Sequence, residues 1–148
     1  MAETSTNENK SVERIANGIS FMPYMRHLGM EFVEGGDGYV KLLLRFQKEN
    51  TTAADALHGG AIASLIDTTG SLAAWTTAEL GNPRYFGSTL GINVNYLSGI
   101  LAQDCYAEGR VLKRGKEIIY SEVHVKNAEG KLCAQGTVVY RIIDRGEG

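Results

Sequence analysis

The hydrophobic and polar residues of this chain repeat with different periods in different segments. Residues 29–46 contain two segments with a period of two, and the glycine-rich stretch 35–38 separates them. In the second segment the apolar side chains of Val40, Leu42 and Leu44 alternate along one side of the chain. This pattern predicts two β-strands joined by a turn, each with one face toward a core.

The residues before this hairpin predict a short helix and a tail. Apolar side chains fall on one side of a helix over residues 11–21, and Pro23 is expected to end that helix. Residues 1–10 are almost entirely polar, which is typical of a disordered terminus. We therefore expect a disordered tail over residues 1–10 and a single domain over residues 11–148.

A period of 3.6 residues begins at His58 and predicts a long helix to about Leu80, where the sequence Gly-Asn-Pro ends it. The two sides of this helix differ in the size of their side chains. The larger apolar side is expected to face a sheet, and it consists of Ile62, Leu65, Ile66, Thr69, Leu72 and Ala73. The other side is a stripe of small residues with one carboxylate: Gly60, Ala63, Ser64, Asp67, Gly70, Ser71 and Ala74.

Four segments after the helix again have the period of a strand, and short turns separate them. They are residues 89–96, 104–113, 117–126 and 132–143. Gly115 lies in one of the turns, where a positive φ suits glycine. The order of elements predicts an α+β fold, with the long helix packed on one face of a curved antiparallel sheet.

Composition narrows the possible classes of protein. The chain has 148 residues and a net charge of -2 at pH 7, so it lacks the basic excess typical of nucleic-acid binding. No apolar run approaches the ~20 residues of a membrane helix. Cys105 and Cys133 form no CxxC pair and no leader sequence is evident, which favours a reducing, cytoplasmic compartment. The scattered histidines and cysteines predict no metal site, and we expect no cofactor.

The strongest chemical signal is the sequence His58-Gly59-Gly60 at the start of the helix, followed by Asp67 two turns later. Backbone N–H groups at a helix N-terminus lack partners and lie at the positive end of the helix dipole, so they can stabilise an oxyanion. Each feature alone has an ordinary explanation: the glycines form a turn, the histidine caps a helix, and the aspartate is solvated. Their combination on one helix favours a catalytic site.

At these residues the sequence resembles the hotdog-fold acyl-CoA thioesterases, in particular the PaaI-like subfamily of the phenylacetate pathway. The resemblance rests on the HGG motif, on the aspartate nine residues after its histidine, and on the strand STLGINVNYLS. It covers about residues 25–143. It implies a single hotdog domain, in which a curved sheet wraps the central helix, and the hydrolysis of an acyl-CoA or aryl-acyl-CoA thioester to a free acid and CoA.

The resemblance also implies roles for individual residues. Asp67 is expected to be the catalytic carboxylate, as a nucleophile or as a general base toward water. The backbone N–H of Gly60, beside Gly59 in the thioester pocket, is expected to polarise the thioester carbonyl. His58 is expected to orient the motif, and Thr89 to position the attacking water.

Two further groups of residues are candidates for substrate binding. The family commonly has an asparagine where this chain has Thr52, and the nearest asparagine is Asn50. Arg114 and Lys116 flank the turn at Gly115 and are candidates for the phosphates of CoA; the ordinary explanation is a solvated hairpin tip.

The spacing along the helix has a consequence for assembly. Gly60 and Asp67 are seven residues apart, about 10.5 Å along the helix axis, and an aspartate side chain reaches only about 3 Å. The two groups cannot meet at one carbonyl carbon within one chain. A second, antiparallel copy of the helix would bring them together, so we expect a homodimer or a homotetramer with sites between subunits.

Two alternative functions remain open at this point. One is a hotdog acyl-thioester dehydratase or hydratase, and the other is a non-catalytic module that binds acyl-CoA. The acyl group is also open. Its pocket has candidate lining residues that are equally plausible as core: Phe21, Met22, Tyr24, Met25 and Trp75.

Overall fold

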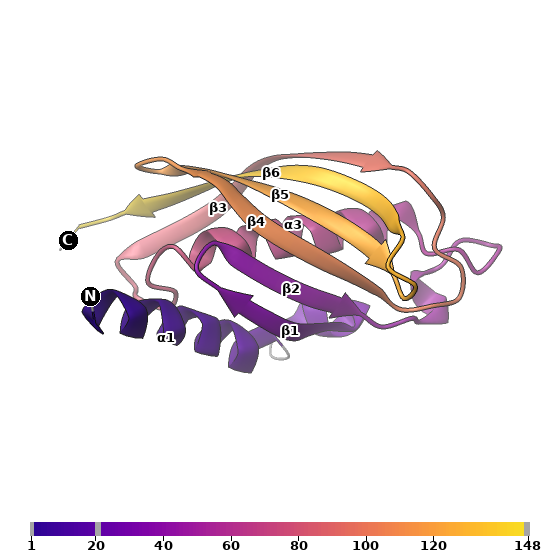
Figure 1. The fold of residues 1–148 in the computed structure, drawn as a ribbon, viewed down its shortest axis with the longest axis horizontal. Helices are drawn as coiled ribbons and strands as arrows, with labels where there is room; N and C mark the ends of the chain where they lie inside the picture. Colours follow the sequence, from indigo (N-terminus) through magenta and orange to yellow (C-terminus); the bar gives the residue numbers. More distant parts are fainter. Residues whose placement is uncertain (1, 20–21, 147–148) are drawn as a thin grey trace.

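One antiparallel sheet wraps a long helix in the computed structural model, which describes residues 2–19 and 22–146 (Figure 1). Among the described residues the sheet has six strands in the order β1-β2-β4-β5-β6-β3. The helices are α1 (Ala2–Gly18), α2 (Pro23–Leu28) and α3 (Gly59–Trp75), with a short 3₁₀ turn at Lys48–Asn50. The strands are β1 (Met30–Gly36), β2 (Tyr39–Leu44), β3 (Tyr85–Tyr96), β4 (Cys105–Arg114), β5 (Ile118–Asn127) and β6 (Leu132–Asp144).

The number and order of the predicted strands are confirmed, although β3 begins at Tyr85, four residues before the predicted start. The ends of two helices also differ from expectation. The central helix α3 ends at Trp75, five residues before Leu80. The hydroxyl groups of Thr76 and Thr77 explain the earlier end, because they donate hydrogen bonds of 2.6 Å to the carbonyls of Ala73 and Ala74. Those carbonyls lie in the last turn of the helix, where threonine hydroxyls supply the missing partners.

The N-terminal helix also differs from the prediction. Helix α1 begins at Ala2 rather than residue 11 and ends at Gly18, so residues 2–10, expected to be a disordered tail, are helical. The expected end at Phe21 lies outside the described residues. Pro23 does not end a helix but begins α2, since proline at the first helical position loses no hydrogen bond. The division of the chain into a tail and a domain stays a prediction.

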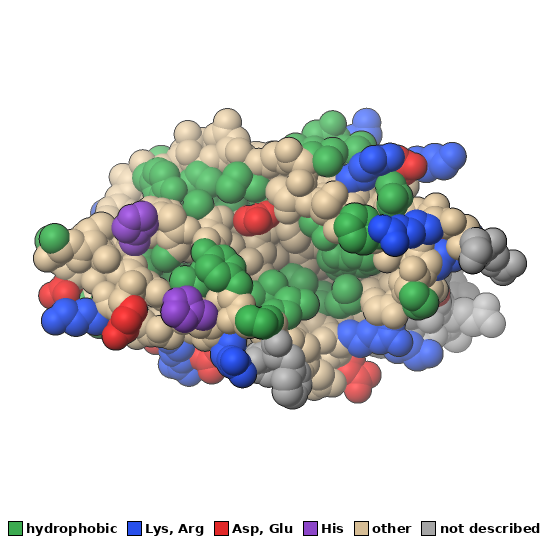
Figure 2. All heavy atoms as spheres, turned by 180° about the vertical axis from the view of Figure 1, so that it is seen from behind, with side chains coloured by type: hydrophobic (Ala, Val, Ile, Leu, Met, Phe, Trp, Pro, Cys, Tyr) green, Lys and Arg blue, Asp and Glu red, His purple; other side chains and the backbone are tan. Residues whose placement is uncertain are grey.

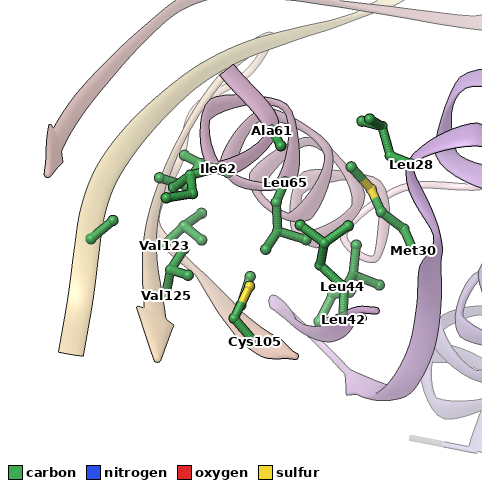
Figure 3. Close-up of a cluster of buried hydrophobic side chains, with 14 of the residues drawn as sticks. Leu28, Met30, Leu42, Leu44, Ala61, Ile62, Leu65, Cys105, Val123 and Val125 are labelled. Carbon is green, nitrogen blue, oxygen red and sulfur yellow. The ribbon is translucent and has the colours of Figure 1, made fainter. Parts of the chain in front are cut away.

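The core lies between α3 and the concave face of the sheet (Figure 3). Every residue of the predicted apolar side of α3 is buried. The small-residue side divides in two: Gly70 and Ala74 are buried against the sheet, whereas Ser64, Asp67 and Ser71 are only half-buried. The open part of that side is therefore narrower than the sequence indicated.

Helix and sheet approach each other closely at Gly70 and Gly109. A Cβ on Gly109 of β4 would lie 2.9 Å from Cγ2 of Thr69 and 3.0 Å from its carbonyl oxygen. A Cβ on Gly70 would lie 2.5 Å from Cγ2 of Val138. Side chains at these two positions would hold the helix away from the sheet, so glycine sets the spacing of the two layers.

Strand β3 is an open edge of the sheet, since it pairs with β6 alone among the described strands. The other edge strand, β1, packs against α1 and α2. Five large apolar side chains of β3 and its C-terminal continuation are exposed: Phe86, Leu90, Ile92, Tyr96 and Leu97. A long edge strand with exposed apolar residues is a ready surface for pairing with another strand.

The close contact at Gly109 leads to a stability prediction. We expect Gly109→Ala to lower the free energy of unfolding by about 1–3 kcal/mol, because the added methyl group must displace the backbone of α3. Gly36→Ala is the matched control, since a Cβ at Gly36 meets no atom within 4 Å. Urea unfolding measures both variants, and equal stability of the two would contradict the importance of this contact.

Candidate functional site

Asp67 lies at the middle of α3 and is held by hydroxyl groups from two elements. The Thr89 hydroxyl of β3 donates a hydrogen bond of 2.7 Å to Oδ1 of Asp67. The Ser71 hydroxyl, one turn later on α3, lies 3.4 Å from the same oxygen and 3.3 Å from the Thr89 hydroxyl. Both contacts are to Oδ1, so among the described residues Oδ2 has no hydrogen-bond partner and can face a substrate.

The start of α3 is capped by its own motif histidine. Nδ1 of His58 accepts a hydrogen bond of 2.8 Å from the N–H of Gly60. Among the described residues, the Gly59 N–H donates no hydrogen bond. Gly60 was the expected donor to a bound carbonyl, but its N–H is occupied because the side chain of an N-cap residue bonds to the second helical N–H. The Gly59 N–H is the donor that stays available.

Strand β3 contacts α3 at both of these places. The Tyr96 hydroxyl donates a hydrogen bond of 2.8 Å to the carbonyl of Gly59, near the helix start. Thr89 bonds to Asp67, which is eight residues further along the helix, or about 12 Å. One edge strand therefore carries a contact to the free N–H end of the helix and a contact to the carboxylate.

A cavity of about 300 Å³ opens beside Asp67. Asp67, Thr89 and Ser71 form its polar side. The remaining lining is mostly apolar or aromatic and comes from α2, from the second half of α3 and the loop after it, and from β6: Met22, Met25, Thr68, Leu72, Trp75, Leu80 and Tyr140. Such a cavity suits an apolar group attached to a polar reacting centre.

Tyr140 contributes a buried phenol to the lining of this cavity. Burial is the main cause that raises the pKa of the Tyr140 phenol, and the negative charge of Asp67 raises it further. The hydrogen bond from Trp75 acts in the opposite direction. The phenol therefore stays neutral at physiological pH and adds no charge beside the carboxylate.

The structure does not bring every predicted site residue to this cavity. Asn50 is buried and donates through Nδ2 to the carbonyl of Leu28 at 2.7 Å, which ties its loop to the end of α2. Arg114 donates to the Thr77 hydroxyl and to the carbonyls of Gly115 and Lys116, so it holds its own hairpin. Lys116 lines a second hollow at that hairpin.

Two aromatic residues of the site had no signal in the sequence. Tyr96 and Tyr140 were placed on strands, but a period of two shows only on which face a residue lies. Their partners, Gly59 and Trp75, belong to another element and become neighbours only when the helix crosses the sheet. Ser71 carried a weaker signal, since it follows Asp67 by one helical turn in the small-residue stripe.

The face opposite to that of Figure 1 has apolar side chains across its middle, while Lys and Arg lie at its ends and lower margin (Figure 2). Within residues 2–19 and 22–146, no helix combines the length and apolar character needed to cross a membrane. Over the same residues, His, Cys, Asp and Glu form no group of three that could hold a metal ion.

The fold and the sequence both agree with known thioesterases. A solved thioesterase from Haemophilus influenzae superposes with a TM-score of 0.81, at 23% identity and over 92% of each chain. The PaaI protein of the Escherichia coli phenylacetic acid degradation operon superposes with a TM-score of 0.80, at 16% identity, over 93% of this chain and 96% of its own. The sheet wrapped around α3 is thus the hotdog fold of thioesterases.

Sequence comparison then gives the family. The family model described as the thioesterase superfamily matches residues 55–134, which include α3, Asp67 and Thr89. Human acyl-coenzyme A thioesterase 13 is 35% identical over 116 residues, which are 76% of this chain and 80% of the human protein. The chain belongs to the thioesterase superfamily, and it is a thioesterase.

Proposed function

We propose that this protein hydrolyses acyl-CoA thioesters, with Asp67 as its catalytic carboxylate. The observation that carries the proposal is the bond from Thr89 to Oδ1 of Asp67 at the mouth of an apolar cavity. The carboxylate is held by one oxygen and presents the other beside a space that suits an acyl chain. The similarity to human acyl-coenzyme A thioesterase 13 supports CoA as the thiol.

Asp67 acts on the carbonyl carbon by one of two routes. As a nucleophile it adds through Oδ2, the C–S bond breaks with its electron pair on sulfur, and water then hydrolyses the mixed anhydride. As a general base it takes a proton from water, the oxygen of which adds to the carbon before the thiolate leaves. Either way the products are the free acid and CoA. Thr89 orients the carboxylate in both routes.

The negative charge that develops on the thioester oxygen needs a donor. We assign this role to the Gly59 N–H rather than to the Gly60 N–H, because His58 already accepts from the latter at 2.8 Å. A donor held at a helix N-terminus needs no reorganisation during the reaction, and one such donor contributes roughly 10²–10³ in rate.

The donor and the carboxylate meet only if two chains share one site. They are about 12 Å apart along α3, and β3 contacts Gly59 through Tyr96 and Asp67 through Thr89. Antiparallel pairing of two β3 edges centred on Asn93, with Leu90 as the extra residue of the bulge between Thr89 and Gly91, puts Thr89 of one copy opposite Tyr96 of the other. The Asp67 of one copy then lies beside the Gly59 of the second. A homodimer, alone or as half of a homotetramer, has two such sites.

Basic residues of one hairpin and the two free cysteines bear on the binding of CoA and on the cellular compartment of the protein. Arg114 and Lys116 are candidates for the CoA phosphates through the hollow at the β4–β5 hairpin, in which Lys113 and Lys116 lie. Free Cys105 and Cys133, both buried, support a reducing, cytoplasmic compartment.

A thiol-release assay separates the proposed function from its alternatives. Release of CoA thiol supports a thioesterase, and loss or addition of water supports a dehydratase or hydratase. Binding without turnover supports a non-catalytic module that binds acyl-CoA. The protein's own cysteines do not interfere, since burial raises the pKa of Cys105 to about 12 and Cys133 is also buried.

We expect Asp67→Asn to lower kcat by at least ~10²-fold while the affinity for a non-hydrolysable acyl-CoA changes little. Thr89→Ala removes only the orienting hydroxyl, so we expect a loss of roughly tenfold, because water partly replaces it. Steady-state kinetics and calorimetric binding measure both effects. Turnover of Asp67→Asn near the wild-type rate would remove Asp67 from the mechanism.

The shared site is tested with Gly59→Pro and its control Gly59→Ala. His58 has φ -64° and ψ 136°, which suits a residue before proline, and Gly59 is the first helical residue, so proline removes its N–H without breaking a helical hydrogen bond. Alanine controls for the added Cβ, which in both variants would lie 3.3 Å from Cζ of Tyr96. We expect Gly59→Pro to be nearly inactive and Gly59→Ala to retain activity. A heterodimer of Gly59→Pro with Asp67→Asn has one intact site and should recover about half of the wild-type activity. An inactive, folded heterodimer would exclude the shared site.

The pairing of β3 edges predicts the effect of a charge near the two-fold axis. Ile92→Lys puts two ammonium groups beside each other in the dimer, and we expect monomers with little activity. Leu112→Lys is the control, since Leu112 is also exposed but lies on β4, and it should leave the dimer intact. Light scattering after gel filtration gives the mass of each variant. A fully active dimer of Ile92→Lys would rule out this interface.

A further inference from the structure

Two aromatic side chains lie together in the cavity on the side away from the start of α3. Nε1 of Trp75, the last residue of α3, donates a hydrogen bond of 2.9 Å to the hydroxyl of Tyr140 on β6. The two rings meet edge to face, with centroids 6.3 Å apart and an interplanar angle of 66°. Both side chains line the cavity that contains Asp67. The pair therefore belongs to the same space as the proposed catalytic carboxylate.

The backbone of β3 supports this pair from behind. A Cβ on Gly87 would lie 2.6 Å from the hydroxyl of Tyr140 and 2.7 Å from Cζ2 of Trp75. The rings thus lie directly on the strand and cannot retreat toward it. The end of α3 is fixed as well, since the Gly38 N–H donates to the Thr76 hydroxyl at 2.8 Å. Trp75, held by Tyr140, by the backbone of β3 and by the end of α3, therefore forms a rigid wall of the cavity.

The cavity follows α3 from the carboxylate to this wall. Asp67, Ser71 and Trp75 lie at successive turns, so the distance from the carboxylate to Trp75 is about 12 Å along the axis. Strand β3 runs alongside, with Thr89 at the level of Ser71 and Gly87 at the level of Trp75. Leu72, Met25 and Leu80 make the intervening lining apolar. This direction suits an acyl chain and not the polar pantetheine arm of CoA.

We propose that Trp75, positioned by Tyr140 and Gly87, closes the acyl cavity and sets the maximum length of the acyl chain. This inference rests on the proposed function, because it assumes that the thioester lies at Asp67. Carbon–carbon bonds are about 1.5 Å long, so a space of about 12 Å holds an extended chain of about eight to ten carbons. Longer chains have to displace a wall that cannot retreat toward β3, and their affinity falls steeply.

The three residues allow variants with opposite expected effects. Trp75→Ala removes the wall and should raise kcat/KM for 14- and 16-carbon acyl-CoAs at least about tenfold relative to the eight-carbon substrate, since single methylene groups already discriminate by that factor. Gly87→Ala pushes the rings into the cavity, so its limit should be shorter than that of the wild type. Tyr140→Phe keeps the volume of the ring and should leave the length limit within about two carbons.

The experiment measures two quantities for the wild type and each variant. One is kcat/KM for straight-chain acyl-CoAs of 4 to 16 carbons, and the other is Kd for the matching thioethers, which cannot be hydrolysed. Circular dichroism and thermal unfolding establish that each variant is folded. Where Gly87→Ala does not fold, Trp75→Ala and Tyr140→Phe decide the question without it.

The outcomes distinguish the length limit from the proposed function. An upward shift of the limit in Trp75→Ala, in both kcat/KM and Kd, supports the wall. A folded Trp75→Ala with the wild-type limit overturns it, even if the protein is an active thioesterase. A wild type that hydrolyses no acyl-CoA but binds the thioethers with a limit that depends on Trp75 contradicts the proposed function and keeps the wall.

Discussion

The close approach of α3 to the sheet is the constraint on which the rest of the structure depends. It requires Gly70 on the helix and Gly109 on β4, because a Cβ at either position would fall within about 3 Å of the opposite layer. With its inner side in contact with the sheet, the helix has only one orientation about its axis. Ile66 and Thr69 then face the core, and Asp67 is left at the boundary between core and solvent.

Strand β3 connects this helix to the surface of the molecule. It contacts α3 through Tyr96 at the helix start and through Thr89 at the carboxylate. Its Gly87 supports Trp75 and Tyr140 at the helix end. The same strand has a free edge with exposed apolar residues. Orientation of the carboxylate, the wall of the cavity and the proposed subunit contact thus depend on one element, which explains its length of 12 residues.

The sequence predicted the elements well because they have regular periods, and it predicted contacts between elements poorly. The strands and the buried side of α3 follow from periods of 2 and 3.6 residues. The end of α3 at Trp75 depends on two threonine hydroxyls, and the hydrophobic periodicity of the sequence does not show where the helix ends. Asp67 was found as the one carboxylate in the small-residue stripe of the helix, and Thr89 through the resemblance to a family. Tyr96 and Tyr140 were not, since their roles arise only where the helix crosses the strands.

The bond between Gly60 and His58 also fixes the hydrogen positions of the imidazole. Nδ1 accepts the backbone N–H, so its lone pair is engaged, and in the neutral ring the hydrogen resides on Nε2. The same nitrogen is thus part of the cap of α3, beside the backbone bonds from Ala61 and Ile62 to the His58 carbonyl. The histidine of the motif therefore belongs to the architecture of the helix start, with Nδ1 turned to the backbone of its own helix and Nε2 as the nitrogen left for other partners.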